Sequence, residues 1–316
     1  NLFYDKENAP VILGGRYGLG SKDTTPSQIK VVFDNMNGAM KNQFTVGIND
    51  DVTFTSLEVK EEIMTESADT IRCKFWGLGS DGTVGANKNA IKIIGDHTDM
   101  YAQGYFSYDS KKSGGITTSH LRFGDSPIRS PYLVVTPDFV ACSVPSYLEK
   151  YDMLKGLKDG GTFLLNSIWS EEETIKHLPN HMKRYMAEHN ISFYTINATK
   201  LAQEIGLGNR TNTIMQSAFF KIADIIPYEE AVKEMRKFIV KSFGRKGEDV
   251  VNMNFAAVEK GPQSLPVSPL FGGGGRLDPA LRDTLAKGAT AAEGIAEGAA
   301  RHGNPGAPVH RRANAH

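Results

Sequence analysis

Residues 71–95, IRCKFWGLGSDGTVGANKNAIKIIG, constrain the fold of this chain more than any other stretch. They open with a β-favouring run over 71–76, continue through four closely spaced glycines, and end in an amphipathic run over 84–94. This order predicts a strand, a tight turn and a helix. A helix that begins beside a glycine turn directs its unpaired N–H groups and the positive end of its dipole at the space in front of it. The sequence therefore predicts a phosphate or nucleotide site there.

The balance of charged residues means that the protein as a whole carries no strong net electric field. The chain has 316 residues, 40% of them hydrophobic, and its counts of Lys plus Arg and of Asp plus Glu are equal at 36 each. We expect a soluble globular protein whose surface favours neither nucleic acid nor an anionic membrane. No apolar run reaches the roughly 18 residues that a membrane span needs, and the chain starts without a secretion signal. The expected location is the cytoplasm.

The side chains that hold metals and iron–sulfur clusters are scarce. The only two cysteines, Cys73 and Cys142, both lie in apolar segments, so we expect them to be core residues. Two thiols are too few for an iron–sulfur cluster or a structural zinc. The histidines do not combine with carboxylates at ligand spacing, and no G-x-S-x-G elbow marks a hydrolase. We therefore predict neither a metal site nor a catalytic residue in this chain.

Changes in composition divide the chain into three parts. Residues 1–60 are expected to be the end of one α/β domain, and the polar, acidic stretch 58–67 marks its boundary. Within this part, Thr24 or Thr25 followed by Pro26 predicts a helix start. A short strand pair is expected over 44–49 and 52–54. The stretch 261–316 is rich in Ala, Gly and Arg, and it is predicted to be a disordered, low-complexity tail because it has too little apolar area to offset its ordering entropy.

In residues 68–258, strands and helices alternate, which predicts an α/β domain with a mostly parallel, Rossmann-like sheet flanked by helices. The expected strands are 71–76, 104–108, 132–136, 162–165, 191–196 and 250–255, the last closing the sheet, and 116–123 is either a strand or an extended loop. The expected helices are 83–95, 144–157, 171–189 with a break or start at Pro179, 198–205, 214–225 and 228–243.

Five segments together resemble one family. They are GGRYGLGSKDTTPSQIKVVFDNM at 14–36, CKFWGLGSDGTVGANKNAIKIIGD at 73–96, GGITTSHLRFGDSPIRSPY at 114–132, DFVACS at 138–143 and NRTNTIMQSAFFKIADIIP at 209–227. Over residues 1–258 the chain resembles the pyruvate:ferredoxin (or flavodoxin) oxidoreductases in their single-chain bacterial form. The resemblance implies that 1–60 is the end of the family's domain II. It also implies that 68–258 is domain III, called gamma because it is a separate subunit in multi-subunit relatives. The tail departs from the family.

The resemblance implies that the whole enzyme converts pyruvate and coenzyme A to acetyl-CoA and CO2 and passes electrons to ferredoxin or flavodoxin. Thiamine diphosphate with Mg²⁺ and [4Fe-4S] clusters carry that chemistry in the family. This sequence has neither the family's G-D-G and N-N thiamine motif nor a run of cluster cysteines. We therefore expect these cofactors in other parts of a larger enzyme, and an isolated fragment that is inactive. The family also implies contacts with other domains of the same enzyme and a homodimer.

The resemblance makes residues 68–258 a platform for coenzyme A, whose diphosphate and ribose phosphate require amide donors and a cation. The bend over 79–83 offers backbone N–H groups and hydroxyls. Lys111 offers a cation, and two asparagines offer neutral hydrogen-bond donors and acceptors. Asn212 is expected at the start of a late helix and Asn254 at the end of the last predicted strand. The predicted binding residues are Gly79, Ser80, Asp81, Gly82, Thr83, Lys111, Asn212 and Asn254.

Two other interpretations stay open. A G-x-G-x-x-G turn with an acidic residue after the second strand is also the signature of NAD binding, and Asp109 stands where that carboxylate would hydrogen-bond the ribose. Lys111 and Lys112 follow it directly, which favours a phosphorylated ribose, and no catalytic pair for hydride transfer is evident. The alternatives are an NAD(P)-binding oxidoreductase and a non-catalytic scaffold domain.

Overall fold

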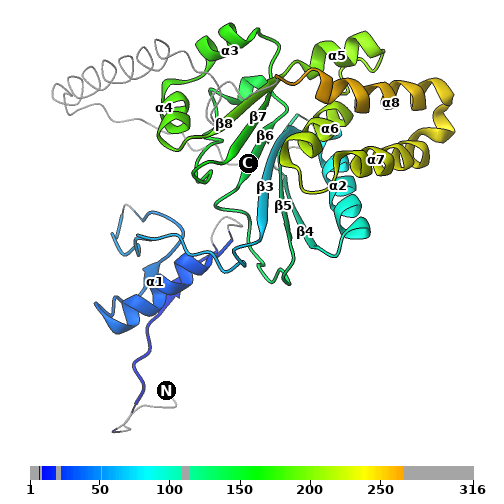
Figure 1. Ribbon diagram of the computed structural model, residues 1–316. Coiled ribbons are helices and arrows are strands. Elements are labelled where there is room, and N and C mark those ends of the chain that lie inside the picture. Colours follow the sequence, from blue (N-terminus) through cyan, green and yellow to red (C-terminus); the bar gives the residue numbers. More distant parts are fainter. Residues whose placement is uncertain (1–6, 8, 19–22, 51, 109–113, 267–316) are drawn as a thin grey trace, which may run out of the picture.

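A computed structural model shows the fold of the described residues, which are 7, 9–18, 23–50, 52–108 and 114–266 (Figure 1). Their centre is a six-stranded sheet with helices on both faces. Its strands are β3 (Ile71–Leu78), β4 (Tyr101–Tyr108), β5 (Ile116–Gly124), β6 (Phe139–Cys142), β7 (Thr162–Asn166) and β8 (Ser192–Ile196). The helical segments after β3 are α2 (Thr83–His97), η2 (Pro145–Tyr147), α3 (Glu171–His177), α4 (Asn180–Glu188), α5 (Ala198–Ile205), α6 (Asn212–Ala223), α7 (Tyr228–Phe243), η3 (Gly244–Lys246) and α8 (Glu248–Gln263).

The sheet confirms the predicted α/β architecture. Its strand order is β4-β5-β3-β6-β7-β8. The strands β3, β6, β7 and β8 pair in parallel, whereas β5 runs antiparallel between β3 and β4. From β3 the chain passes through α2 to β4 on one side, and later places β6 on the other side. The carboxyl end of β3 is therefore a point where the strand order reverses, and ligands of open α/β sheets bind at such points.

Alternating side chains of the sheet belong to two separate cores. Phe139 of β6 packs into the core under α2, α5, α6, α7 and α8, whereas the next residue, Val140, belongs to the core on the face that carries α4. Both faces of the strand are thus covered, as is usual for parallel sheets. In the first core, the ring of Phe219 in α6 lies 5.1 Å from the rings of both Phe75 and Phe139. This aromatic cluster joins α6 to the centre of the sheet.

The strand predicted over 132–136 is wrong, and β6 forms shortly after it instead. The N–H of Leu133 donates to the carboxylate of Asp23 at 2.9 Å, and the N–H of Val134 donates to Nδ1 of His120 at 3.2 Å. Because side chains take these two donors, they are not available to a strand ladder. β6 is a strand because it pairs with both β3 and β7, which depends on the assembled sheet.

The helix predicted over 144–157 is also wrong, because only the single turn η2 forms there. Gly156 has a φ of +79°, and a Cβ at this position would lie 2.4 Å from the carbonyl oxygen of Val135. Only glycine fits both that dihedral angle and that close approach. The apolar side chains of this stretch pack from a series of turns into the core shared with β6 and β7: Leu148, Met153, Leu154 and Leu157.

The strand predicted over 250–255 lies inside helix α8. The buried residues of this helix recur every three or four positions: Val251, Asn254, Ala257, Val258 and Gly261. That spacing, with an acidic first turn, is characteristic of a helix, although the short run Val250–Val251 favours a strand when read alone. The start predicted for the tail, at 261, falls within α8, which ends at Gln263. Residues 267–316 lie outside the described part of the chain.

Helix boundaries that depend on local signals match the predictions. α1 (Pro26–Asn37) begins directly after Thr25, which closes a capping box with its first turn. Ser170 closes a second capping box at the start of α3. α3 and α4 are separated at Pro179, where a break was predicted. In each case the hydrogen bonds or steric limits involve neighbours in the sequence, so no tertiary contact is needed to specify them.

The segment before β3 forms a small unit at the amino edge of the large sheet (Figure 1). β1 (Gly15–Arg16) pairs in parallel with β2 (Phe44–Thr45), so the strand pair predicted over 44–49 and 52–54 is wrong. The side chain of Asp50 accepts two N–H groups from the residues that follow it, at 3.0 and 3.1 Å. These bonds curl the expected hairpin turn into a loop that has no second strand.

Candidate functional site

The glycine bend lies between the carboxyl end of β3 and the first turn of α2, where the strand order reverses. Ser80 and Gly82 both have left-handed backbones, with φ of +76° and +90°. A Cβ on Gly82 would also lie 3.1 Å from the side chain of Asn212. Position 77 must be glycine for a different reason: a Cβ there would lie only 2.8 Å from the side chain of Thr83. The bend therefore brings α2 close to β3 and α6 close to the bend.

Asp81 turns its carboxylate into the bend. Oδ1 accepts the N–H of Thr83 at 2.7 Å, and Oδ2 accepts the Thr83 hydroxyl at 2.9 Å and the N–H of Leu78 at 2.8 Å. Both donors of Thr83 are thus already used inside the protein, which corrects the expectation that they are available to a phosphate. Within the described residues, the N–H groups of Ser80, Gly82, Val84 and Gly85 make no hydrogen bond. These four amides are the backbone donors that this part of the described chain still offers to an anion.

A groove of about 480 Å³ opens beside the bend. The bend, the end of β4 and the start of β5 form its walls: Leu78, Gly79, Ser80, Asp81, Gly82, Val84, Tyr108, Gly115, Ile116 and Thr117. Thr117 is only 5% exposed, and its hydroxyl has no hydrogen-bond partner among the residues that the structure describes. A buried hydroxyl without a partner costs free energy, so its presence in the wall of a groove is typical of a place where a ligand or water completes the bond.

The structure places Asn212 against the bend and Asn254 behind it, in contact with the residue that follows Asn212. Asn212 is the first residue of α6, and its side chain lies against Gly82. The hydroxyl of the next residue, Thr213, donates to Oδ1 of Asn254 at 3.0 Å, and Nδ2 of Asn254 donates to the carbonyl of Val250 at 2.8 Å. Asn254 therefore reaches this region from a buried position in helix α8 and not from the end of a strand. A role of either side chain in binding stays a prediction.

Lys111, the predicted cation, lies outside the described residues, as do Asp109 and Lys112. The described residues next to this segment are Tyr108 and Gly114, and Tyr108 and Gly115 line the groove.

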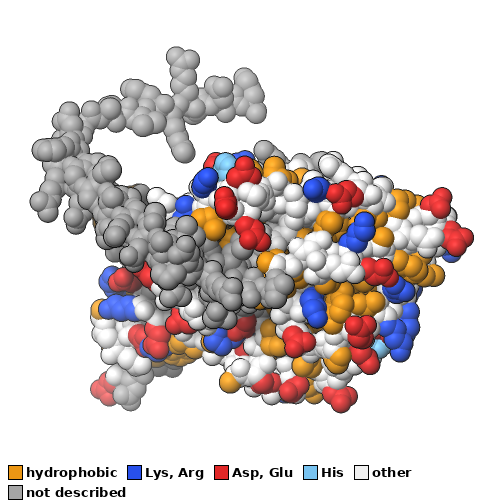
Figure 2. Space-filling view, turned by 45° about the horizontal axis from the view of Figure 1, so that its top comes forward, with side chains coloured by type: hydrophobic (Ala, Val, Ile, Leu, Met, Phe, Trp, Pro, Cys, Tyr) orange, Lys and Arg blue, Asp and Glu red, His pale blue; other side chains and the backbone are white. Residues whose placement is uncertain are grey.

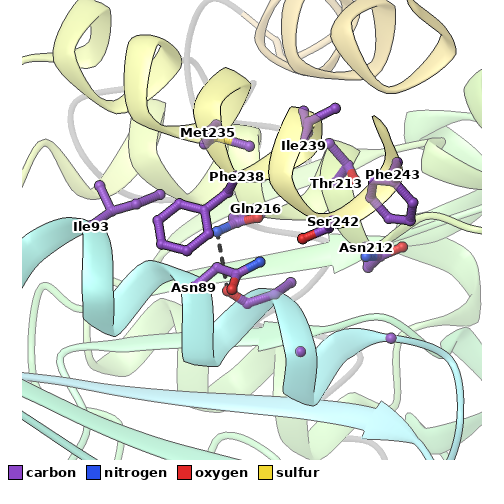
Figure 3. A pocket seen from close by; sticks show the side chains of 13 residues that line it. Asn89, Ile93, Asn212, Thr213, Gln216, Met235, Phe238, Ile239, Ser242 and Phe243 are labelled. Atoms are coloured by element: carbon purple, nitrogen blue, oxygen red, sulfur yellow. Dashed lines mark hydrogen bonds between the residues drawn. The ribbon is translucent and has the colours of Figure 1, made fainter. Parts of the chain in front are cut away.

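A second cavity of about 350 Å³ lies on the other side of the bend, between α2, α6 and α7 (Figure 3). It shares Gly82 and Asn212 with the region described above. Figure 3 shows Asn89 of α2 across from Phe238 of α7, with Gln216 of α6 between them. Nε2 of Gln216 donates to the carbonyl of Ala86 at 3.0 Å, which fixes the orientation of this amide.

Sequence reasoning missed three polar residues at this edge of the sheet: Thr117, Ser143 and Asn166. Nδ2 of Asn166 donates to the carbonyl of Ser143 at 3.0 Å, and its Oδ1 accepts the N–H of Ala198 at 3.0 Å. Asn166 is 2% exposed, so it joins the ends of β6 and β7 to the start of α5. Ser143 and Asn166 stand at the carboxyl ends of their strands, and a correct prediction of β6 would have pointed to Ser143.

The described residues do not fit a metal or an iron–sulfur cluster. They contain no group of three or more His, Cys, Asp or Glu side chains that could hold a metal ion. Cys73 and Cys142 are both free and buried, as predicted. Burial raises the pKa of the Cys142 thiol to about 12 and raises that of Cys73 as well. Both are therefore neutral thiols, which are poor ligands because metals bind the thiolate.

The charged side chains on the surface agree with the zero net charge of the chain. Figure 2 shows Lys and Arg side chains intermixed with Asp and Glu over the visible face. In the part of the chain that the structure describes, no helix is both long and apolar enough to cross a membrane. Any attraction for an anion must therefore arise locally, at places such as the bend.

Residues 72–264 match the protein family described as pyruvate ferredoxin/flavodoxin oxidoreductase. The chain is 62% identical over 256 residues to the pyruvate:ferredoxin oxidoreductase of Moorella thermoacetica, which covers 81% of this chain and 22% of that protein. It is 59% identical over 267 residues to the pyruvate-flavodoxin oxidoreductase of Enterobacter agglomerans, with 84% and 23% covered. The chain thus spans less than a quarter of the length of these relatives.

One solved structure, the subunit PORC of pyruvate oxidoreductase from Thermotoga maritima, has a similar fold. The TM-score is 0.51 at 20% sequence identity, and the match covers 63% of this chain and 98% of that subunit. At this identity the likeness supports the fold of the six-stranded domain and nothing further.

Proposed function

The chain belongs to the pyruvate ferredoxin/flavodoxin oxidoreductase family, and from this premise we propose that it supplies the coenzyme A-binding surface of a larger enzyme. That enzyme converts pyruvate and coenzyme A to acetyl-CoA and CO2 and passes the electrons to ferredoxin or flavodoxin. The names of the two relatives support the reaction, and the groove beside the glycine bend supports the role of this chain in it.

The observation that carries the proposal is the convergence of unused donors on this groove. Gly82 and Val84 in the groove wall present free N–H groups at the positive end of the α2 dipole, with the free N–H of Gly85 next to them in the chain, and the buried hydroxyl of Thr117 has no partner within the described residues. The diphosphate of coenzyme A meets these amides, and Lys111 neutralises part of its charge. Ser80 is exposed in the bend and adds a hydroxyl.

Asp81 has a different role from the one expected of a phosphate contact. Its carboxylate occupies the donors of Thr83 and repels a phosphate from the innermost part of the bend. The phosphates are thereby displaced toward the amides of Val84 and Gly85, one turn further out. Gly79 and Thr83 act through the shape of the bend, and Asn212 and Asn254 approach the ligand from α6 and α8.

The NAD(P) alternative is disfavoured by the strand order. In a dinucleotide-binding fold the second strand pairs directly with the first, and its end places a carboxylate beside the ribose. Here β5 lies between β3 and β4, so the end of β4 is two strand spacings, roughly 10 Å, from β3. The scaffold alternative predicts no ligand at all, and binding measurements distinguish it from ours.

The remaining parts of the proposal concern the whole enzyme. Thiamine diphosphate, Mg²⁺ and [4Fe-4S] clusters belong to other parts of that enzyme. The described residues of this chain contain no group of side chains suited to hold a metal ion. The partners of this chain are other domains of the same enzyme, which is a homodimer with ferredoxin or flavodoxin as the acceptor. The neutral, unpaired thiols of Cys73 and Cys142 support a reducing cytoplasm.

Calorimetric titration of the oxidoreductase that contains this chain tests the proposal. Coenzyme A binds, NAD does not, and Lys111→Ala raises the dissociation constant for coenzyme A about tenfold or more because a charge-assisted hydrogen bond is lost. Lys92→Ala removes an exposed lysine on α2 that does not line the groove, and it serves as the matched control. Equal affinity for NAD, or an unchanged dissociation constant in Lys111→Ala, contradicts the assignment.

A further inference from the structure

Strand β4 forms one outer edge of the six-stranded sheet, and its outer side is open (Figure 1). It pairs with β5 over its whole length, Tyr101–Tyr108, and no other strand among the described residues lies beyond it. Apart from this ladder, the described residues make no backbone–backbone hydrogen bond with β4. Every second residue of an edge strand points its N–H and C=O groups away from the sheet, so β4 presents a row of unpaired groups.

The sequence of β4 lacks the features that usually protect such an edge. YAQGYFSY contains neither a charged residue nor a proline, and its register with β5 runs without a bulge. The opposite edge strand, β8, has five residues and none of them is exposed, whereas β4 has eight, with Tyr101, Tyr105 and Tyr108 exposed by 50%, 38% and 59%. A long edge without lysine, proline or a bulge favours pairing with a further strand.

Symmetry limits the registers in which β4 can pair with its own copy. A two-fold axis runs the two strands antiparallel, and residues that face each other must point their side chains to the same side of the sheet. The axis therefore passes through a residue that faces itself. When that residue is Tyr105, the two tyrosine rings form an aromatic cross-strand pair, and Gln103 faces Ser107 of the second copy.

On the other side of the sheet, this register places small residues opposite large ones. Gly104 faces Phe106 of the second copy, and Ala102 faces Tyr108. These side chains lie on the side of α2, because a Cβ on Gly104 would overlap Ile91 of that helix. An aromatic ring opposite an edge glycine covers backbone that would otherwise stay exposed. The strand is therefore complementary to itself, and no like charges meet along it.

We propose that β4 pairs with β4 of a second copy of this chain on a two-fold axis through Tyr105, so that the two six-stranded sheets become continuous. A second copy is favoured over a different partner because residues 102–108 supply both halves of each small–large and polar pair. The inference rests on the homodimer that forms part of the proposed function, and it does not involve coenzyme A.

Cysteine substitution in the oxidoreductase that contains this chain tests the register. Facing Cα atoms lie roughly 4.5–5.5 Å apart, within the roughly 4.4–6.8 Å that a disulfide requires. We expect Tyr105→Cys to form, on mild oxidation, a disulfide between the two copies, identified by mass spectrometry as a peptide linked to its own copy at residue 105. The matched control is Tyr101→Cys, which is more exposed on the same side of the same strand but whose two copies lie roughly 27 Å apart.

Charged variants test the same contact without a covalent bond. Tyr105→Lys places two like charges opposite each other, so sedimentation over a dilution series should show a dimer dissociation constant at least about tenfold higher. Tyr105→Glu should have the same effect. A mixture of the two variants should restore the dimer, because a residue that faces itself then pairs opposite charges. Tyr101→Lys should stay within twofold.

Four results overturn the pairing: a monomeric enzyme, no disulfide at residue 105, equal disulfide yields at 101 and 105, or no recovery in the mixture of charged variants. If coenzyme A binds and its affinity still responds to Lys111→Ala, only the pairing of β4 fails. If the disulfide at 105 forms in an enzyme that does not bind coenzyme A, the pairing stands and the coenzyme A assignment fails.

Discussion

The six-stranded domain and the segment before it bury their apolar side chains to very different extents. The domain encloses two cores, one on each face of the sheet, with fully buried residues such as Phe163 and Phe219. The segment over residues 9–66 carries ten of the seventeen large hydrophobic side chains that are exposed in the described part of the chain. Phe54 is 75% exposed and Phe33, on α1, 59%. The segment therefore leaves in contact with solvent a large share of the apolar side chains that a domain of its own would bury.

Polar contacts hold this segment to the domain. The guanidinium of Arg122 donates through Nε to Glu66 at 2.7 Å, and both side chains are almost fully buried. The hydroxyl of Tyr132 donates to the same carboxylate at 3.0 Å and lies 2.7 Å from the Thr65 hydroxyl. The comparison teaches that the domain has the cores of an independent fold, whereas the segment has only an anchor. Its exposed apolar side chains fit the expectation that it belongs to another domain of a larger enzyme.

The largest contrast is expected between two phenylalanines. Phe219→Ala opens a cavity between the rings of Phe75 and Phe139, and it should lower the free energy of unfolding by about 3–5 kcal/mol. Phe33→Ala changes only an exposed side chain and should stay within about 0.5 kcal/mol. Urea unfolding of the 316-residue chain measures both. Similar losses for the two variants would show that the segment has a core of its own.

The second prediction concerns the anchor. Arg122→Leu leaves Glu66 buried without its partner and should destabilise the chain by about 3 kcal/mol. Combining it with Glu66→Leu should restore most of the loss, because no unpaired charge is then left. Unfolding of the two single variants and the double variant gives the coupling energy. Independent, additive losses would mean that the pair does not join segment and domain.

The third prediction uses pH. Burial, and then the nearby charges of Lys74 and Arg122, lower the pKa of His120 to about 3 from an ordinary 6.5. Below pH 6.5 the His120 side chain is protonated in the unfolded chain but stays neutral in the folded chain. The free energy of unfolding therefore decreases as the pH is lowered from 6.5 to about 3. His120→Asn keeps an acceptor for the N–H of Val134 and should abolish this dependence.

Between pH 7 and 5 the chain with His120 should lose about 2 kcal/mol more than the variant, as measured by urea unfolding at both values. Parallel pH profiles for the two proteins would contradict this. Substitutions confined to α1 should leave the profile unchanged, because the titrating group belongs to the sheet.

The smallest effects are expected from the two capping boxes. Thr25→Ala at α1 and Ser170→Ala at α3 should each cost about 1 kcal/mol. The Ser170 variant should lower the global unfolding midpoint, because α3 belongs to the domain. The Thr25 variant should instead speed hydrogen exchange in α1 alone, since that helix opens locally. A global shift from Thr25→Ala would show that the two regions unfold as one unit.

Sequence reasoning was most accurate where the signal is local. The start of α1 at Pro26, the break at Pro179 and the strand, glycine bend and helix at 71–95 involve residues that are neighbours in the chain. It failed over 132–136, 144–157 and 250–255. In the first of these, the donors of Leu133 and Val134 are taken by side chains distant in sequence.

The candidate site divides in the same way. The bend at 79–83 and its place before a helix follow from the residues, and the resemblance to the family brought in Asn212 and Asn254. The contact between Asn212 and Gly82 depends on the packing of α6 against α2, which only the structure gives. The hydroxyl of Thr117 and the amide cavity between α2, α6 and α7 likewise come from elements far apart in the chain.

By itself, the sequence determined the α/β class, the glycine bend and the capped starts of its helices, because dihedral limits and hydrogen bonds between near neighbours control these features. The tertiary structure alone decided that β5 separates β3 from β4, that Asp81 faces inward, and which donors stay free for a ligand. Those outcomes depend on which surfaces are buried together and on which polar groups find partners there, and neither is encoded in any short stretch of the chain.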